Sequence, residues 1–254
     1  MTELTPQGRF AEIARQDERA ALVTVLEGPG AGAKMLVEPD GTRRGSLGSP
    51  ELDDEATAAA DELMWAERAE QRGTLFIDVT FPAPRLIIFG AIDFAAQLCT
   101  LARTSGWRPY VVDPRGFFAR PDRFPDAEEV VAAWPEEAFE RIGGIDRATS
   151  IAVLTHDPKL DDAALGIALR SEAAYVGAMG SRRAQEKRRE RLVAKGITDE
   201  ELARLSAPIG LDLGALTPEE TALSIMGEIV AHRRGREGGR LSHLRGGRIH
   251  EVTA

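Results

Sequence analysis

Residues 85–95 of this 254-residue chain read RLIIFGAIDFA. The apolar run predicts a strand over residues 85–90. The apolar spacing after it predicts a helix over residues 93–105, which Gly106 would end. A strand that turns through a glycine directly into a helix is the first half of a strand–helix–strand unit. The segment therefore indicates an α/β domain that begins near residue 85.

The chain after this segment alternates between strands and helices. Further strands are predicted at residues 109–113, 127–132, 149–155 and 174–178, and further helices at residues 135–141, 161–170, 182–195, 199–205 and 218–233. The last helix has the clearest start, because Thr217 is a good N-cap, Pro218 suits the first turn and Glu220 completes a capping box. The alternation predicts an α/β fold with a Rossmann-like, doubly wound and mainly parallel sheet.

The first part of the chain has a different pattern. Strands are predicted at residues 20–26, 34–37, 43–47 and 74–80, with a hairpin turn at Pro39-Asp40-Gly41 and a helix at residues 53–67. Two prolines, Pro82 and Pro84, then disfavour both strand pairing and helix. We therefore expect a small N-terminal α+β domain over residues 1–82, the Rossmann-like domain over residues 83–234, and a flexible, basic, Gly/Arg-rich tail over residues 235–254.

Charge and cysteine content limit the classes of function. A formal net charge of -9 disfavours nucleic-acid binding, which depends on neutralising phosphates. The single cysteine, Cys99, excludes an internal disulfide, and its place on the apolar face of a helix predicts that it lies in the core. Residues 1–9 lack a signal-peptide pattern, and the most apolar stretch, residues 86–99, is too short to span a bilayer. We expect a cytoplasmic protein that binds neither nucleic acid nor membrane.

The first loop, residues 90–95, resembles a dinucleotide-binding loop with one change. Such loops follow the pattern G-x-G-x-x-G/A, with an acidic residue about twenty positions later. Gly90 fits the first position, and Asp113 at the end of the second strand could accept ribose hydroxyls. Ile92 replaces the second glycine and would hold a pyrophosphate away from the backbone. Asp93 is either a simple N-cap or a binding residue at the helix start.

The loop after the strand at residues 149–155 carries His156 and Asp157. Both are candidate catalytic residues, because an imidazole or a carboxylate can exchange protons with a substrate, and His156 could also contact a bound group. The alternative is structural: Asp161 caps the next helix and His156 satisfies the loop backbone. The sequence leaves both interpretations open.

A glycine-rich loop opens the helix at residues 182–195. It contains Gly177, Gly180, Ser181 and Arg182, so free backbone amides and a guanidinium would meet at the helix N-terminus. That combination suits an anion or a phosphate. The alternative is a tight turn with solvent-facing arginines, and the Arg-rich run over residues 182–191 is expected to be mostly a solvated helix face.

A second glycine-rich loop precedes the last helix and contains Gly210, Asp212 and Gly214. These residues suit close approach of a ligand, although turn geometry alone would explain the glycines. No Ser/His/Asp order, zinc-ligand spacing or Walker loop occurs, so no metal site is predicted.

Three of these loops together resemble the XdhC/CoxI accessory proteins of molybdenum hydroxylases. The resemblance covers roughly residues 85–232, and a weaker one extends to the N-terminal segment around residues 32–47. It rests on Thr155-His156-Asp157-Pro158-Lys159-Leu160-Asp161-Asp162, on Tyr175-Val176-Gly177-Ala178-Met179-Gly180-Ser181-Arg182-Arg183, and on Ala207-Pro208-Ile209-Gly210-Leu211-Asp212-Leu213-Gly214-Ala215 with Thr217-Pro218-Glu219-Glu220, with support from Val112-Asp113-Pro114-Arg115 and Phe124-Pro125-Asp126-Ala127.

The resemblance implies a maturation factor rather than a turnover enzyme. Such a protein would bind molybdenum cofactor (molybdopterin) as cargo, protect it, and assist its sulfuration and insertion into a xanthine or CO dehydrogenase-type enzyme. Its partners would be that molybdenum hydroxylase and a cysteine desulfurase, and we expect a homo-oligomer. An NAD(P)-binding Rossmann oxidoreductase is the alternative function.

The chain departs from the family pattern at two places. Family members commonly have Gly-Ala-Gly-His in the first loop, where this chain has Gly90-Ala91-Ile92-Asp93. Many also have a Gly-Gly-Cys turn in the N-terminal domain, where this chain has Gly48-Ser49-Pro50-Glu51. If the missing cysteine contacts cofactor or sulfur in relatives, this chain handles its cargo differently.

Overall fold

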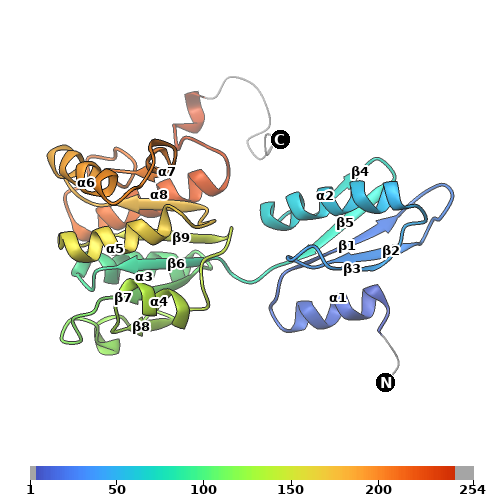
Figure 1. Cartoon of the computed structure of the whole chain (residues 1–254), viewed down its shortest axis with the longest axis horizontal. Helices are drawn as coiled ribbons and strands as arrows, with labels where there is room; N and C mark the ends of the chain where they lie inside the picture. Colours follow the sequence, from blue (N-terminus) through green and yellow to red (C-terminus); the bar gives the residue numbers. More distant parts are fainter. Residues whose placement is uncertain (1–3, 244–254) are drawn as a thin grey trace. The chain divides into compact units, whose positions relative to one another are not determined.

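The computed structural model describes residues 4–243, and the chain divides into two compact units, the first ending at Pro82 and the second beginning at Ala83 (Figure 1). The first unit is an antiparallel sheet with the strand order β3-β2-β1-β5-β4. Its elements are α1 (Pro6–Arg15), β1 (Ala20–Val25), β2 (Lys34–Val37), β3 (Arg43–Gly45), α2 (Pro50–Ala66), β4 (Glu70–Arg72) and β5 (Leu75–Thr80).

Helices α1 and α2 cover opposite faces of this sheet (Figure 1). Leu63 of α2 packs in a cluster with Val23 of β1, whereas Ile13 of α1 packs on the other face with Leu36 of β2. Helix α1 was not predicted; it is short and Ile13 is its one buried residue. The strand expected at residues 43–47 ends two residues earlier, and the helix expected from residue 53 begins at Pro50.

The second unit is a parallel sheet with the strand order β11-β10-β9-β6-β7-β8. The chain runs outward from β6 to β8, returns to β9 beside β6, and then runs outward on the other side. This is the doubly wound order of Rossmann folds, so the predicted fold class is confirmed. Its elements are β6 (Arg85–Phe89), α3 (Asp93–Thr104), β7 (Arg108–Val112), β8 (Glu129–Val131), α4 (Pro135–Arg141), β9 (Thr149–Val153), α5 (Pro158–Ala168), β10 (Tyr175–Ala178), α6 (Arg182–Ala194), α7 (Asp199–Ala203), β11 (Leu205–Ser206) and α8 (Pro218–Arg233).

Alternate residues of each strand build the two halves of the core. Ile87 and Phe89 of β6 point to a cluster shared with α4, α5 and α6, whereas Leu86 and Ile88 point to a cluster shared with α3 and α8. Cys99 is 1% exposed in the second cluster, as predicted. Because the strands are buried on both faces, they appear in the sequence as continuous apolar runs.

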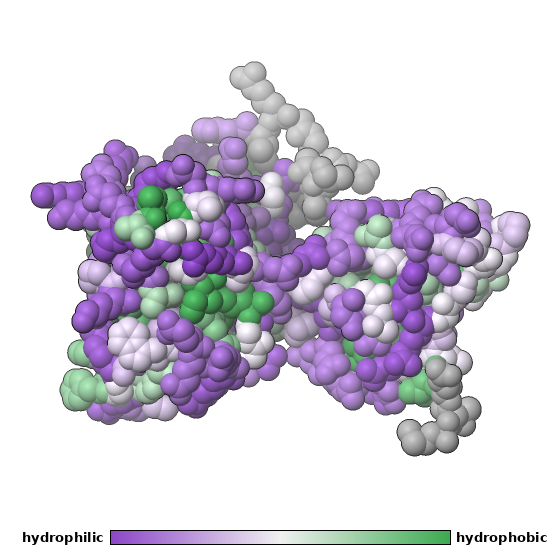
Figure 2. Space-filling model, in the orientation of Figure 1, coloured by the Kyte–Doolittle hydropathy of each residue, from purple (hydrophilic) through white to green (hydrophobic). Residues whose placement is uncertain are grey.

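The surface in view is mostly hydrophilic, with smaller hydrophobic areas (Figure 2). Within residues 4–243, no helix is long and apolar enough to cross a membrane. The tail expected over residues 235–254 lies largely outside the described residues, which end with a short 3-10 turn, η2 (Leu241–His243).

Candidate functional site

The carboxyl edge, defined here as the edge at which the parallel strands of the second unit end, collects every predicted site residue. Ligands of open α/β sheets bind at this edge, where the strand order reverses. Here the reversal lies between β6 and β9. The loops before helices α3, α5, α6 and α8 therefore form the candidate site.

The first loop contacts two neighbouring loops. Gly90 is buried with a φ of +108°, and a Cβ there would lie 3.1 Å from the backbone nitrogen of Thr155. The next residue, Ala91, donates its N–H to a carboxylate oxygen of Asp113 at 3.0 Å. Glycine is thus required by the approach of the β9 loop, and the ends of β6, β7 and β9 are joined directly.

The Asp113 carboxylate is fully buried, and both of its oxygens accept hydrogen bonds. One oxygen accepts from Ala91 and from Arg115 Nη2, and the other accepts from the backbone and Nε of Arg115. Burial raises the pKa of Asp113, but the hydrogen bonds from Arg115 and Ala91 outweigh burial and hold it below its ordinary value. Both oxygens are engaged, so Asp113 is not free to accept ribose hydroxyls as its sequence position had suggested.

Asp93 is not the N-cap of α3. Ile92 occupies that position without a side-chain cap, and Asp93 is the first helical residue. The Asp93 side chain is 87% exposed, and its carboxylate lies 3.2 Å from Arg123. Asp93 therefore projects an exposed carboxylate at the helix start.

His156 and Asp157 have different environments. Among the described residues, the exposed His156 ring has no hydrogen-bond or ion-pair partner. Asp157 is the N-cap of α5 and accepts the N–H of Lys159 at 2.9 Å, so the cap is Asp157 and not Asp161. The structure thus leaves His156 available and assigns Asp157 a structural bond.

The loop between β10 and α6 carries unpaired amides. Ser181 caps α6 by accepting the N–H of Ala184, and Arg182 is exposed beside it. Within residues 4–243, the N–H groups of residues 180–183 donate to no protein acceptor. A Cβ at Gly177 would lie 2.6 Å from both Ile209 and the Tyr175 hydroxyl, so this glycine is needed for packing rather than for ligand approach.

A buried ion pair lies beneath this loop and was not predicted. Arg188 and Asp161 are each 3% exposed and are joined at 2.7 Å. Arg188 is an exception within the run 182–191, most of which is exposed as expected. Burial raises the pKa of Asp161, partly offset by the bond from Arg188. An arginine six residues into a charged helix is expected to be solvated, and only the fold turns it inward.

The loop before α8 is anchored by Glu228. The Glu228 carboxylate accepts the Gly210 N–H at 2.6 Å and the Tyr175 hydroxyl at 2.5 Å. Gly210 has a φ of +107°, and a Cβ there would lie 2.5 Å from Ser224 Oγ. Asp212 and Gly214 are exposed. Packing therefore accounts for Gly210, while Asp212 and Gly214 remain accessible.

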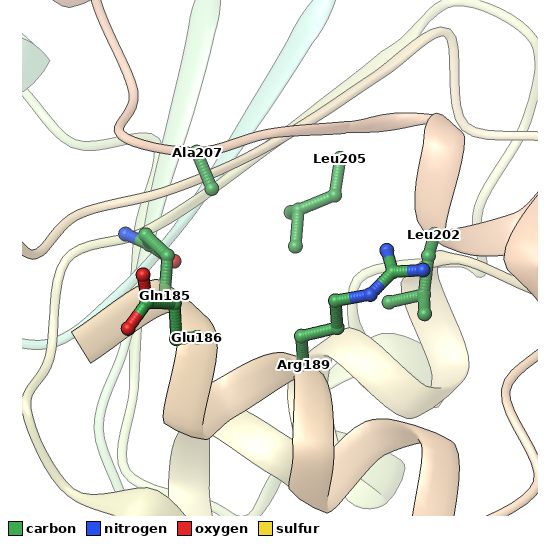
Figure 3. A pocket seen from close by; sticks show the side chains of 6 residues that line it. All are labelled: Gln185, Glu186, Arg189, Leu202, Leu205 and Ala207. Atoms are coloured by element: carbon green, nitrogen blue, oxygen red, sulfur yellow. The ribbon is translucent and has the colours of Figure 1, made fainter. Parts of the chain in front are cut away.

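A pocket of about 230 Å³ is lined by residues of α6, α7 and β11 (Figure 3). The side chains from α6 face Leu205 and Ala207, and Arg189 reaches toward Leu202 (Figure 3). None of the predicted site residues lines the pocket. Its lining residues are Gln185, Glu186, Arg189, Leu202, Leu205 and Ala207.

The carboxyl edge thus contains two groups of predicted residues. Gly90 lies against Thr155 and is linked to Asp113 through Ala91, whereas Gly177 and Gly210 meet around Ile209 and Glu228. Within residues 4–243, no hydrogen bond or ion pair joins the exposed residues His156, Arg182 and Asp212 to one another. In the same part of the chain, no three His, Cys, Asp or Glu side chains are grouped to hold a metal ion.

Comparison with known families gives two matches. A family profile described as the XdhC Rossmann domain matches residues 86–229, and one described as the XdhC and CoxI family matches residues 13–75. These ranges contain the three loops that carry the resemblance and most of the antiparallel sheet of the first unit.

Two curated proteins illustrate the similarity. The chain is 29% identical over 165 residues to a protein of Bacillus subtilis named as a probable xanthine dehydrogenase subunit, and the match covers 65% of this chain and 48% of that protein. It is also 26% identical over 156 residues to the molybdenum cofactor insertion chaperone PaoD of Escherichia coli. This match covers 61% of this chain and 42% of PaoD. The chain spans about half the length of the curated relatives it matches.

A solved structure agrees with these matches. The crystal structure of a xanthine dehydrogenase from Bacillus halodurans superposes with a TM-score of 0.63 and 25% identity, covering 91% of this chain and 67% of that one. The Rossmann-domain profile alone covers more than half of the 254 residues. The resemblance found in the loops is confirmed, and the chain belongs to the XdhC/CoxI family.

Proposed function

We propose that this protein is an accessory factor that binds molybdenum cofactor and assists its sulfuration and insertion into a molybdenum hydroxylase of the xanthine or CO dehydrogenase type. The observation that supports this proposal most is the row of unpaired amides at residues 180–183, beside Arg182 and Arg183 and at the N-terminus of the 13-residue helix α6. Amides and a helix dipole in this arrangement favour a phosphate.

The cargo fits the polar groups of the carboxyl edge. Molybdopterin supplies a phosphate and an anionic metal-bearing end when bound, so it needs donors rather than a nucleophile. Residues 180–183 would hold the phosphate, and His156, exposed and without a protein partner among the described residues, would donate to another part of the cargo. The buried carboxylate after β7, Asp113, is neutralised by Arg115, which limits repulsion of an anion.

The chain's own thiol does not support a role in sulfur transfer. Cys99 is the single cysteine and is buried, and burial followed by the nearby Asp126 raises its pKa to about 12. A thiol is nucleophilic as the thiolate, which this environment suppresses at neutral pH. We therefore propose that a cysteine desulfurase supplies the sulfur and that this protein, as a homo-oligomer, presents the cofactor.

The geometry gives less support to the alternative NAD(P)-dependent oxidoreductase. A nicotinamide dinucleotide in the usual pose needs a free acidic residue after the second strand and close approach at the second glycine position. Asp113 has both oxygens engaged, and Ile92 stands at that glycine position.

The test is to purify the protein from cells that make molybdenum cofactor and to measure released pterin by fluorescence. We expect bound pterin and stimulation of a molybdenum hydroxylase in a reconstitution assay. Arg182→Glu with Arg183→Glu should lower the bound pterin, whereas Arg189→Glu, on the same helix, should not. Absence of both pterin and stimulation would show that the proposed function is wrong.

A further inference from the structure

Arg188 is an exception within α6. The helix Arg182–Ala194 is strongly charged, and its buried residues are Arg188 and Leu192. Burying a guanidinium is costly unless it is paired and hydrogen-bonded throughout. Arg188 lies beneath the loop of unpaired amides and donates a hydrogen bond to it.

Side chains of α6 bind three consecutive carbonyls of that loop. Arg188 Nη2 donates to the Met179 carbonyl at 3.0 Å, and Gln185 Nε2 donates to the carbonyls of Ala178 and Gly180, each at 3.2 Å. Arg188 Nη1 also donates to Gln185 Oε1, so the two side chains act as one unit. Asp161 holds that unit from α5 through the ion pair with Arg188.

A planar trans peptide points its N–H away from its C=O. The Met179 carbonyl faces Arg188, so the Gly180 N–H points away from Arg188. Likewise, the Ser181 N–H points away from Gln185. The side-chain unit that binds the carbonyls of Met179 and Gly180 therefore turns the Gly180 and Ser181 N–H groups to the opposite side of the loop.

The buried pair is a poor source of stability. Asp161 Oδ1 and Arg188 Nε are buried without hydrogen-bond partners. An incompletely satisfied buried ion pair can be replaced by apolar residues of similar size with little loss, or with a gain, in stability. Stability alone therefore does not account for these residues.

We propose that Arg188 and Gln185, held by Asp161, are positioning residues that aim the N–H groups of Gly180 and Ser181 at a phosphate bound at the start of α6. The inference rests on the proposed function and deepens it, because it assigns the phosphate end of the cargo to this loop. Arg188 and Gln185 touch the loop rather than the cargo.

The test compares a double variant, Asp161→Leu with Arg188→Met, with a matched control, Arg189→Met, an exposed arginine of the same helix. Inorganic phosphate is titrated into the isotope-labelled full chain, and the amide resonances of residues 180–183 are followed, while urea unfolding measures stability. We expect the double variant to remain at least as stable as the wild type and to bind phosphate about tenfold more weakly or less. The control should match the wild type.

A second variant, Gln185→Leu, tests the same inference if the double variant fails to fold. Gln185 lines the pocket of Figure 3, so Gln185→Leu has room for its new methyl groups and removes the bonds to Ala178 and Gly180. Wild-type phosphate affinity in either folded variant would overturn the inference, as would a wild-type loop that does not respond to phosphate. A wild type that responds to phosphate but retains no pterin would overturn the proposed function and leave the positioning role standing.

Discussion

Replacing Gly90 by alanine tests whether the joined ends of β6 and β9 hold the second unit together. The φ of +108° lies outside the conformations that alanine prefers, and the added Cβ would lie 3.1 Å from the Thr155 nitrogen and 3.3 Å from two atoms of its side chain. A left-handed backbone costs an L-residue about 1–2 kcal/mol, and crowding adds to it. We expect a loss of about 2–3 kcal/mol in the free energy of unfolding of this unit.

Cys99 provides an assay that is specific to the second unit. It is the only cysteine of the chain, lies on α3 and is 1% exposed, so a thiol reagent reaches it only when the unit opens. When opening is fast and reversible, the labelling rate is proportional to the opening constant. A loss of about 2–3 kcal/mol therefore predicts labelling about 30- to 150-fold faster than in the wild type at the same pH.

The matched control is Gly166→Ala in the helix α5. No heavy atom lies within 4 Å of a Cβ placed there, and alanine is the better helix former by about 0.5–1 kcal/mol. This variant should label about two- to fivefold more slowly than the wild type. If Cys99 is labelled in Gly90→Ala at the wild-type rate, the joined strand ends do not hold the unit together. The same conclusion follows if the labelling rates of Gly90→Ala and Gly166→Ala change in the same direction.

Two further predictions concern the same edge. Asp113→Asn should lower the free energy of unfolding by about 1–3 kcal/mol near neutral pH, but by much less well below pH ~4. Bonds from Arg115 and Ala91 hold the folded-state pKa of Asp113 below 3.8, so the stabilisation by its carboxylate is present above the unfolded-state pKa and disappears as pH falls through the folded-state pKa. Urea unfolding at both pH values measures the two losses, and equal losses would contradict the prediction. In calorimetric titrations with NADH, Ile92→Gly alone should not create binding. Ile92→Gly with Arg115→Ala should raise affinity about tenfold, because it removes one side-chain bond from each oxygen of Asp113. Strong binding to the single variant would count against the role assigned to Arg115.

Local patterns in the sequence predicted most of the second unit. Apolar runs marked its main strands, and Thr217, Pro218 and Glu220 marked the start of α8, where the structure has the capping box. Three elements were missed or shifted, namely α1, which has one buried residue, the two-residue strand β11 and the start of α5 at Pro158. In these elements, packing against the rest of the unit outweighs local preference.

The sequence placed the loops of the candidate site at one edge of the sheet, but it did not predict their contacts. The loops at Gly90, His156, Gly180 and Gly210 do lie at one edge, because parallel strands end together. Their partners could not be predicted: Arg115 neutralises Asp113, Asp157 replaces Asp161 as the cap, and Glu228 anchors the loop before α8.

The fold class, the family and the order of the loops could be established from the sequence, because they depend on residues close together in the chain. Which polar groups are free depends instead on the tertiary structure. Asp161 meets Arg188 across 27 residues, and Ala91 meets Asp113 across 22, because strand order brings distant segments together. A buried polar group takes whichever partner the fold places beside it, and here Arg188 and Gln185 bind the carbonyls of Met179 and Gly180, whose peptides carry the Gly180 and Ser181 N–H groups.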